Sequence, residues 1–407
     1  MGPIALFDKS FLQSISLDEA VWFDRFFLSI VCPVFYVETL ADLAKEPSAR
    51  GPAERTVREI ANKFPEMGGT PCGFHVDLCI QDLLGFHTPM DGRIPRPGGR
   101  SVRSGTVFDQ TPEEAAFHRW HEGKFDEVER VAAVEWRKEL SELDLAAIAK
   151  ELRALGIDGK SCKTLEEARE FAKTIVNGKD KPYTRLTLAA LFFHVPPHLH
   201  PRISAAWQQS GQRTLNAFAP YAAYCMTVEV FFWIALAAGL IATERPSNRT
   251  DIAYLFYLPF CIAFVSSDKL HRRCAHLFMR PNQEFVWGID LKAALTTVNA
   301  HFLKLPEAER EQGIVKFADS PPAGNLVADL WDRHMRRRQR AEPDEKLSPQ
   351  EEAKLVKRFK EFRKQATLEA TESAAADDEM ISITRWVRKK RGSWWPGLFS
   401  SHVSWAF

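Results

Sequence analysis

The sequence predicts an α/β fold with a central, mostly parallel sheet, and three observations lead to that prediction. Short apolar runs rich in β-branched or aromatic residues occur at 4–7, 30–35 and 262–265. Each run is followed by a segment with the apolar spacing of an amphipathic helix. The first run ends directly at Asp8, and the third is followed closely by Asp268. Strands that alternate with helices are typical of parallel sheets covered by helices on both faces, which is a three-layer sandwich.

The first 45 residues predict a strand, a helix, a strand and a helix in that order. The run 4–7 reads as a strand that ends in a carboxylate. The segment 16–19 has the pattern of a capping box and opens a helix. The run 30–35 follows as a strand, where Pro33 indicates an edge strand or the start of a strand. Glu38 then lies in the first turn of the next helix.

The stretch from 251 to 276 repeats this design near the other end of the chain. Asp251 opens an apolar helical run, the strand-like run 262–265 comes next, and Asp268 starts a basic helix. Acids that follow strands or begin helices can meet at the carboxyl edge of a parallel sheet, where open α/β folds place their sites. The alternative is structural, because aspartate is also a common N-cap and Glu38 falls on a polar helical stripe.

These positions resemble the pattern of the PIN-domain nuclease family. That family has an aspartate after the first strand, a glutamate in the helix after the second, a later helix led by aspartate, and an apolar strand that ends in Ser/Thr-x-Asp. The matching positions are Asp8, Glu38, Asp251, Ser266 and Asp268, within roughly residues 3–45 and 205–300. The resemblance implies a PIN-like Rossmannoid fold whose four acids hold Mg²⁺ or Mn²⁺ and cut phosphodiester bonds, usually in RNA.

The same acids suit this chemistry for independent reasons. Hydrolysis of a phosphodiester needs an activated water and a neutralised phosphate, and a divalent ion provides both. Mg²⁺ prefers oxygen ligands, so carboxylates from separate elements with added waters fit it. The basic helix after Asp268 would then place Lys269, Arg272 and Arg273 beside the phosphate, or present them to solvent.

Composition is that of a globular protein with no overall affinity for polyanions. The 407 residues are 45% hydrophobic and 26% charged, with a net charge of +1. Contacts with nucleic acid must therefore come from local basic patches. The seven cysteines contain no CxxC pair, which predicts a reducing, cytoplasmic location, and the N-terminus shows no signal-peptide pattern.

An apolar run from 214 to 243 is long enough to cross a membrane. It contains one charged residue, Glu229, which would be costly at the centre of a bilayer. A single crossing would also separate Asp8 from Asp268. We therefore expect a helix buried in the protein, with Glu229 as a paired core acid or an extra ligand. A membrane-associated protein remains the competing hypothesis.

The sequence predicts four regions, which are 1–45 (first half of the PIN-like core), 46–204 (a large, mainly helical insertion), 205–303 (second half of the core) and 304–407 (a charged helical region with a basic and aromatic tail). Within the insertion, the Gly- and Pro-rich loop 91–105 carries Arg93, Arg96, Arg100 and Arg103. A mobile arginine loop can clamp a phosphate backbone, although a solvated surface loop explains the same residues.

The residues and the resemblance together predict a metal-dependent nuclease, and the resemblance implies single-stranded or structured RNA as its substrate. Asp8, Glu38, Asp251 and Asp268 would be its ligands and catalytic residues. Lys9 follows Asp8 where the family usually has a small polar residue, which keeps a catalytically inactive binding or scaffold protein open as the alternative. The oligomeric state also stays open, a homo-oligomer included.

Overall fold

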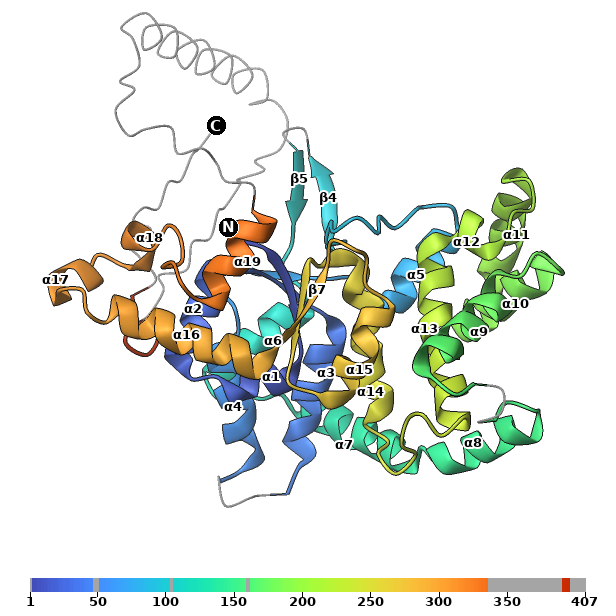
Figure 1. Cartoon of the computed structure of the whole chain (residues 1–407), viewed down its shortest axis with the longest axis horizontal. Helices are drawn as coiled ribbons and strands as arrows, with labels where there is room; N and C mark the ends of the chain where they lie inside the picture. Colours follow the sequence, from blue (N-terminus) through green and yellow to red (C-terminus); the bar gives the residue numbers. More distant parts are fainter. Residues whose placement is uncertain (1, 47–50, 103–104, 159–161, 336–389, 396–407) are drawn as a thin grey trace, which may run out of the picture. The chain divides into compact units, whose positions relative to one another are not determined.

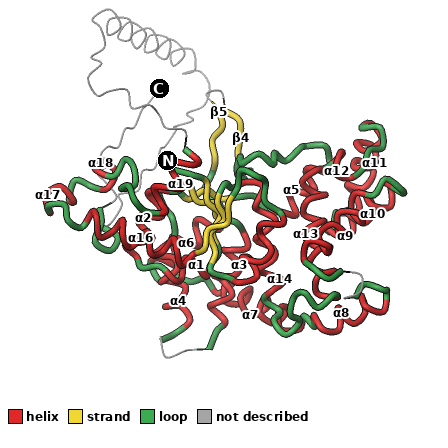
Figure 2. The backbone as a smooth tube through the Cα atoms, viewed as in Figure 1, coloured by secondary structure: helices red, strands yellow, loops and turns green. Residues whose placement is uncertain are grey.

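A five-stranded, fully parallel sheet forms the centre of the fold (Figures 1 and 2). The computed structural model describes residues 2–46, 51–102, 105–158, 162–335 and 390–395. Its strands are in the order β3-β2-β1-β6-β7. Their bounds are β1 (Ile4–Phe7), β2 (Leu28–Val31), β3 (Gly69–Pro71), β6 (Ala263–Ser266) and β7 (Glu284–Trp287). The prediction of an α/β fold with a mostly parallel sheet is confirmed.

Helices connect the strands and cover the sheet. Those near the sheet are α1 (Lys9–Ser14), α2 (Leu17–Phe26), α3 (Pro33–Ala41), η1 (Asp42–Ala44), α4 (Ala53–Lys63), α14 (Asn248–Ala253), η3 (Tyr254–Phe260), α15 (Lys269–Cys274), η4 (Ala275–Leu277), α16 (Gly288–Phe302) and α19 (Leu326–His334). In Figure 1, α2 and α16 pack together on one side of the sheet, whereas α14 and α15 pack together on the other. This arrangement is compatible with three layers.

The sheet order places a topological switch between β1 and β6. The chain passes from β1 to β2 and β3 at one edge, and later returns to β6 and β7 on the other side of β1. Leu6 pairs with Ile30 on one flank and with Phe264 on the other, and all three are fully buried. A strand between two parallel neighbours under helical layers has both faces in the core, which explains its unbroken apolar sequence.

The fifth strand comes from the segment that sequence analysis assigned to the insertion. β3 pairs in parallel with β2, and both α4 and β3 precede the remaining helices of that region. The boundary of the sheet core therefore lies after residue 71 and not after residue 45. The reason for the error is that β3 has three residues, Gly69 to Pro71, and shows no apolar periodicity.

The predicted strand 30–35 is also corrected. β2 ends at Val31, and Pro33 occupies the first turn of α3, where its missing N–H costs nothing. Glu38 consequently lies in the second turn of α3 and not in the first. β2 is an interior strand, so Pro33 does not mark an edge.

The rest of the predicted insertion is mainly helical, with one hairpin. The helices are α5 (His75–Leu83), α6 (Pro112–His121), α7 (Glu127–Glu142), α8 (Leu145–Ala154), α9 (Leu165–Asn177), α10 (Pro182–Phe192), η2 (Pro197–Leu199), α11 (His200–Gln209), α12 (Leu215–Phe218) and α13 (Pro220–Ala237). Part of the predicted arginine loop forms an antiparallel hairpin of β4 (Gly99–Val102) and β5 (Gly105–Phe108). The segment contains residues that favour strands, which are Val102, Thr106, Val107 and Phe108. The prediction of a loop gave more weight to its many Gly and Pro residues.

The apolar run 214–243 contains α13, which packs against α5, α8 and α9. By length and composition α13 is able to span a membrane, and 78% of its apolar window is buried inside the protein. Glu229 is 3% exposed and pairs with Arg249 at 2.6 Å. Of the two roles predicted for Glu229, the structure therefore shows the paired core acid.

The chain divides into two compact units, residues 1–304 with 320–334, and residues 305–319 with 335–407. The described part of the second unit contains α17 (Glu307–Arg310), α18 (Ile314–Phe317) and residues 390–395. Trp394 is fully buried beside Phe317, and the backbone N–H of Ile314 donates to the Trp395 carbonyl at 2.9 Å. Trp394 is thus a core residue of this unit.

Candidate functional site

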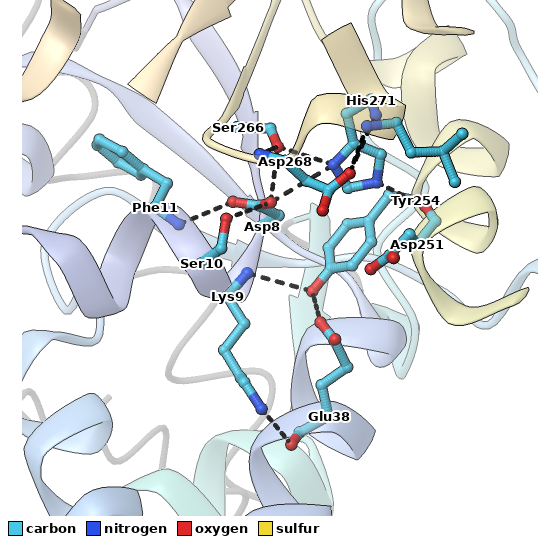
Figure 3. Close-up of polar contacts among 11 residues, drawn as sticks. Asp8, Lys9, Ser10, Phe11, Glu38, Asp251, Tyr254, Ser266, Asp268 and His271 are labelled. Carbon is cyan, nitrogen blue, oxygen red and sulfur yellow. Dashed lines mark hydrogen bonds and ion pairs between the residues drawn. The ribbon is translucent and has the colours of Figure 1, made fainter. Parts of the chain in front are cut away.

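The four predicted acids gather at the carboxyl edge of the sheet, at the switch between β1 and β6. Asp8 directly follows β1, and its N–H donates to the Val265 carbonyl of β6 at 3.2 Å. Asp268 follows β6, while Glu38 comes from α3 and Asp251 from α14. Figure 3 shows their side chains around the Tyr254 ring, so four separate elements contribute to one site. This placement agrees with the expectation from the sequence.

Asp8 is the most constrained of the four acids. Its Oδ1 accepts from the Phe11 N–H at 2.8 Å, and its Oδ2 accepts from the Ser10 and Ser266 hydroxyls at 2.7 and 2.6 Å. The side chain is 3% exposed. Burial raises the pKa of Asp8, but His271 and these donors outweigh it and hold the pKa below its ordinary value. Asp8 is therefore ionised, and most of its oxygen lone pairs are occupied.

The hydrogen bonds around His271 require that the ring is doubly protonated. Its Nε2 lies 2.6 Å from the Asp251 carbonyl, which can only accept. Its Nδ1 lies 2.7 Å from the Ser266 hydroxyl, whose proton goes to Asp8. Ser266 can then only accept from Nδ1. His271 is thus an imidazolium, 1% exposed and 3.4 Å from Asp8 Oδ2.

The electrostatics of His271 agree with this assignment. Burial alone lowers the pKa of a histidine, because the charged form loses its hydration. The hydrogen bond and charge of Asp8, followed by the charge and carbonyl of Asp251, reverse that effect and raise the pKa of His271 to about 9. A buried cation therefore already neutralises one acid of the site.

Glu38 is held by a tyrosine and a lysine. The Tyr254 hydroxyl donates to Glu38 Oε2, and Tyr254 also accepts from the Lys9 N–H at 3.3 Å. Lys9 Nζ donates to the Glu38 carbonyl at 2.9 Å and to Asp42 Oδ1 at 3.0 Å. Burial raises the pKa of Glu38, which the charge of Lys9 only partly offsets. Lys9 thus ties the start of α1 to the Glu38 carbonyl and to Asp42.

Asp268 and Asp251 have the more open carboxylates. Asp268 Oδ1 caps α15 and accepts from the Leu270 and His271 N–H groups at 2.6 and 3.4 Å. Asp251 lies in the first turn of α14. Burial, then the negative charges of Asp268 and Glu38, raise the pKa of Asp251 to about 7, although His271 lowers it. Crowded acids of this kind are relieved by a proton or by a cation.

The raised pKa of Asp251 makes the stability of the metal-free protein depend on pH. The folded state holds the Asp251 proton up to about pH 7, whereas the unfolded chain releases it near 3.8, so stability falls as pH rises between those values. The groups that set this pKa are Glu38, Asp268, His271 and Arg245. Asp251→Asn removes the penalty, and we expect the variant to be more stable than the wild type at pH 8 by on the order of 2 kcal/mol.

Urea denaturation in EDTA at pH 4 and pH 8 checks this expectation. The two proteins should differ little in stability at pH 4, because the folded carboxyl is protonated there and the unfolded one, with a pKa near 3.8, is only just beginning to lose its proton. A variant that is less stable than the wild type at pH 8 would contradict the assignment of Asp251 as a repelled acid.

The donor set fits a hydrated hard cation. Among the described residues, no group of three or more His, Cys, Asp or Glu side chains lies close enough to hold a metal ion together. Mg²⁺, however, keeps several waters and is usually bound through one or two carboxylates. The oxygens of Asp251, Asp268 and Glu38 that do not bind protein donors suit that mode. Asp8, bound to three donors and facing His271, does not present an equally open carboxylate.

The predicted phosphate-binding residues fall into two places. Lys269, Arg272 and Arg273 are exposed on α15, directly after Asp268, at the acidic edge. Arg272 lies 5.0 Å from the Trp287 ring centre, and Arg273 Nη2 donates to the Leu240 carbonyl at 2.9 Å. Lys269 and Arg272 thus keep solvent-facing charge beside the site.

The arginines of segment 91–105 are engaged elsewhere. Arg93 pairs with Asp91 at 2.8 Å, and Arg96 lies over the Phe108 ring at 4.8 Å. Neither contacts the four acids in the part of the chain that the structure describes. Arg100 belongs to β4, and Arg103 lies outside the described residues. Of the predicted cations whose side chains the structure describes, those of α15 lie at the acidic edge, whereas Arg93 and Arg96 do not.

Three residues of the site were missed or misread in the sequence. His271 stands three residues after Asp268, a spacing that returns its side chain toward the helix start, but it lies inside the predicted basic helix and was given no role. Tyr254 stands three residues after Asp251 and was read as part of an apolar run. Lys9 was treated only as a departure from the family pattern. Helical spacing from each acid was the available signal.

Comparison with known proteins gives no relative, since no family model, curated protein or solved structure matches this chain. The class that the fold defines is an α/β protein with a parallel five-stranded sheet and an acidic site at its topological switch. Function must be argued from that site alone.

Proposed function

We propose that this protein is a metal-dependent nuclease of PIN-like architecture, with RNA as its substrate. The observation that carries the proposal is the convergence of Asp8, Glu38, Asp251 and Asp268 from four elements at the switch point, where burial, and then the charges of Asp268 and Glu38, raise the pKa of Asp251 to about 7. Carboxylates that are gathered at one buried edge, with the pKa of one of them raised, are typical of a functional site and favour a cation there. The PIN-like assignment and RNA itself rest on the resemblance of the motifs.

Each group then has a defined task. Glu38, Asp251 and Asp268 would hold Mg²⁺ or Mn²⁺, directly or through water, and the ion when bound lowers the pKa of water and neutralises phosphate charge. Asp8 and Ser266 hold His271, which fixes the end of β6 and the Asp251 carbonyl. We assign Asp8 this positioning role in place of the ligand role that the resemblance implied. Tyr254 orients Glu38.

The exposed cations beside the acids bind the polyanion. Lys269 and Arg272 lie on α15 immediately after Asp268. Contacts of this kind neutralise phosphates and make binding weaken with salt. Phosphate contacts carry no information about base sequence. We therefore expect the protein to select cleavage positions by the geometry of the RNA backbone and not by the identity of the bases.

A cleavage assay tests the proposal. Purified full-length protein is incubated with end-labelled single-stranded RNA in Mn²⁺, Mg²⁺ or EDTA. We expect defined cleavage products with either ion and none in EDTA. A duplex DNA of equal length serves as the comparison substrate. Absence of cleavage in Mn²⁺ and Mg²⁺, with the protein folded and the RNA bound, would contradict the nuclease proposal.

A specific observation favours one other function, a non-catalytic relative that binds nucleic acid. His271 and Lys9 already supply positive charge to Asp8 and Asp42, at 3.4 and 3.0 Å, so part of the acidity is neutralised without a metal. Such a protein would bind RNA through Lys269 and Arg272 and leave it intact. Salt-dependent RNA binding that is identical in Mn²⁺ and EDTA, without products, is the result that this alternative predicts.

A further inference from the structure

A cavity of about 350 Å³ lies at the opposite edge of the sheet from the acids. Pro259 precedes β6 and Gln283 precedes β7, and both line it, so the cavity lies at the amino ends of these strands. Strands of four residues separate the two edges by on the order of 13 Å. The cavity also reaches α9 and α13. Its volume falls at the lower end of the range of small-molecule sites, about 300–1,000 Å³.

The lining is strongly cationic. Arg169 and Lys173 from α9 and Arg280 from the segment before β7 face it, and no carboxylate is among the lining residues. Glu170 pairs with both Arg169 and Lys173 from outside the lining, and its side chain is 61% exposed. Arg280 donates only to carbonyls, those of Met90 and Cys261, in the described part of the chain. Two of the three cations thus share one carboxylate, and the third has a carboxylate partner nowhere in the described part of the chain.

Polar atoms in the lining still lack partners. Arg169 Nε, Arg280 Nε and Asn177 Oδ1 are buried and have no hydrogen-bond partner among the described residues. Buried donors and acceptors are nearly always satisfied in native proteins, by protein, water or ligand. The two guanidinium groups therefore keep a positive charge that an anionic ligand can balance, and Asn177 keeps an amide that can form hydrogen bonds with an amino or hydroxyl group.

The remaining wall is aromatic. Tyr224 and Phe278 line the cavity and contact each other edge to face, with ring centres 6.2 Å apart. The Tyr224 hydroxyl is already used, because it donates to the Leu255 carbonyl at 2.7 Å. The ring therefore offers an apolar surface and not a polar one. A planar group fits against such a surface through dispersion and stacking.

We propose that this cavity binds a phosphorylated small molecule with a planar, hydrogen-bonding ring, the chemistry of a nucleoside monophosphate. Arg169, Lys173 and Arg280 receive the phosphate, Tyr224 and Phe278 pack against the ring, and Asn177 accepts from a ring amino group or a sugar hydroxyl. The site shares no residue with the acidic edge, so it stands independently of the proposed nuclease activity.

Isothermal titration calorimetry on the full chain tests this site, with adenosine 5′-monophosphate, adenosine and inorganic phosphate as the probes. We expect saturable binding of the monophosphate, at least about tenfold tighter than binding of either fragment. Lys173→Gln removes one cation from a side chain that is 40% exposed, so the fold is kept. It should weaken binding of the monophosphate about tenfold, as expected for loss of a charged hydrogen bond.

Two controls separate this site from other causes. Lys163→Gln changes an exposed lysine just before α9 that does not line the cavity, and it should leave the affinity unchanged. Asp268→Asn should also leave it unchanged, so that failure of nuclease activity and failure of this site are distinguishable. The proposal is overturned if the wild type shows no saturable binding, if adenosine or phosphate binds as tightly as the monophosphate, or if Lys173→Gln binds like the wild type.

Discussion

Replacement of His271 with alanine is expected to destabilise the protein by about 3–5 kcal/mol, the cost of removing one partner from a buried ion pair. His271 is 1% exposed and is the cation that faces Asp8 at 3.4 Å. Without it, Asp8 keeps the burial that raises its pKa but loses the cation that opposes this, and the Asp251 carbonyl loses the donor 2.6 Å away. Urea denaturation followed by tryptophan fluorescence measures the effect.

The pH dependence identifies the imidazolium as the cause. The pKa of His271 is raised from 6.5 to about 9, so its stabilisation is complete below pH 6.5 and is lost as pH rises through about 9. The difference between wild type and variant should shrink over that window. His276→Ala is the matched control. The His276 side chain is 58% exposed, and its ion-pair partner, 3.6 Å away, is a glutamate that is also exposed. A His271→Ala effect as small as that of His276→Ala would contradict the buried pair.

Asp268→Asn is expected to reduce RNA cleavage at least about a hundredfold, because changes even in groups that only support metal ligands cost 10–100-fold. The substitution is unusually clean. Asparagine keeps the oxygen that accepts from the Leu270 and His271 N–H groups, and it is as good an N-cap as aspartate. The negative charge is lost, and an amide NH2 replaces the oxygen that would face the cation. The initial rate of cleavage in Mn²⁺ is the measurement.

The control for this change is Asp290→Asn. Asp290 is exposed in the first turn of α16, which follows β7 at the same edge of the sheet, so it matches Asp268 in residue type and element position. Its rate should stay within about twofold of the wild type, since a surface acid outside the site contributes little. Equal rates for Asp268→Asn and wild type, with both proteins folded, would remove Asp268 from the site.

Much of the fold could be predicted because its signals are local. The apolar runs that became β1 and β6 are buried on both faces, and the capping box of Ser16 and Glu19 forms as the pattern indicates. The position of Asp8 and Asp268 at one edge follows from β1 and β6 being parallel neighbours. An apolar run that is followed by an acid therefore indicates, within a few residues, both a strand and a carboxylate at its carboxyl end.

The parts that could not be predicted depend on contacts distant in sequence. β3 is three residues with a proline, and only its pairing with β2 makes it a strand. Tyr254 reaches Glu38 across 216 positions, and nothing near either residue announces the contact. His271 is charged because Ser266 donates its hydroxyl proton to Asp8, which is 258 positions away in the sequence. Propensity and spacing cannot express such constraints.

Binding of Mn²⁺ tests the central claim most directly. An electron paramagnetic resonance titration of the metal-free full chain at pH 8 counts bound ions without any need for substrate. The acidic edge should bind Mn²⁺ saturably, and Asp251→Asn should weaken that binding at least about tenfold, whereas Asp290→Asn should not. Failure of the wild type to bind Mn²⁺, or equal binding by the Asp251→Asn protein, would contradict the claim that these acids gather to hold a cation.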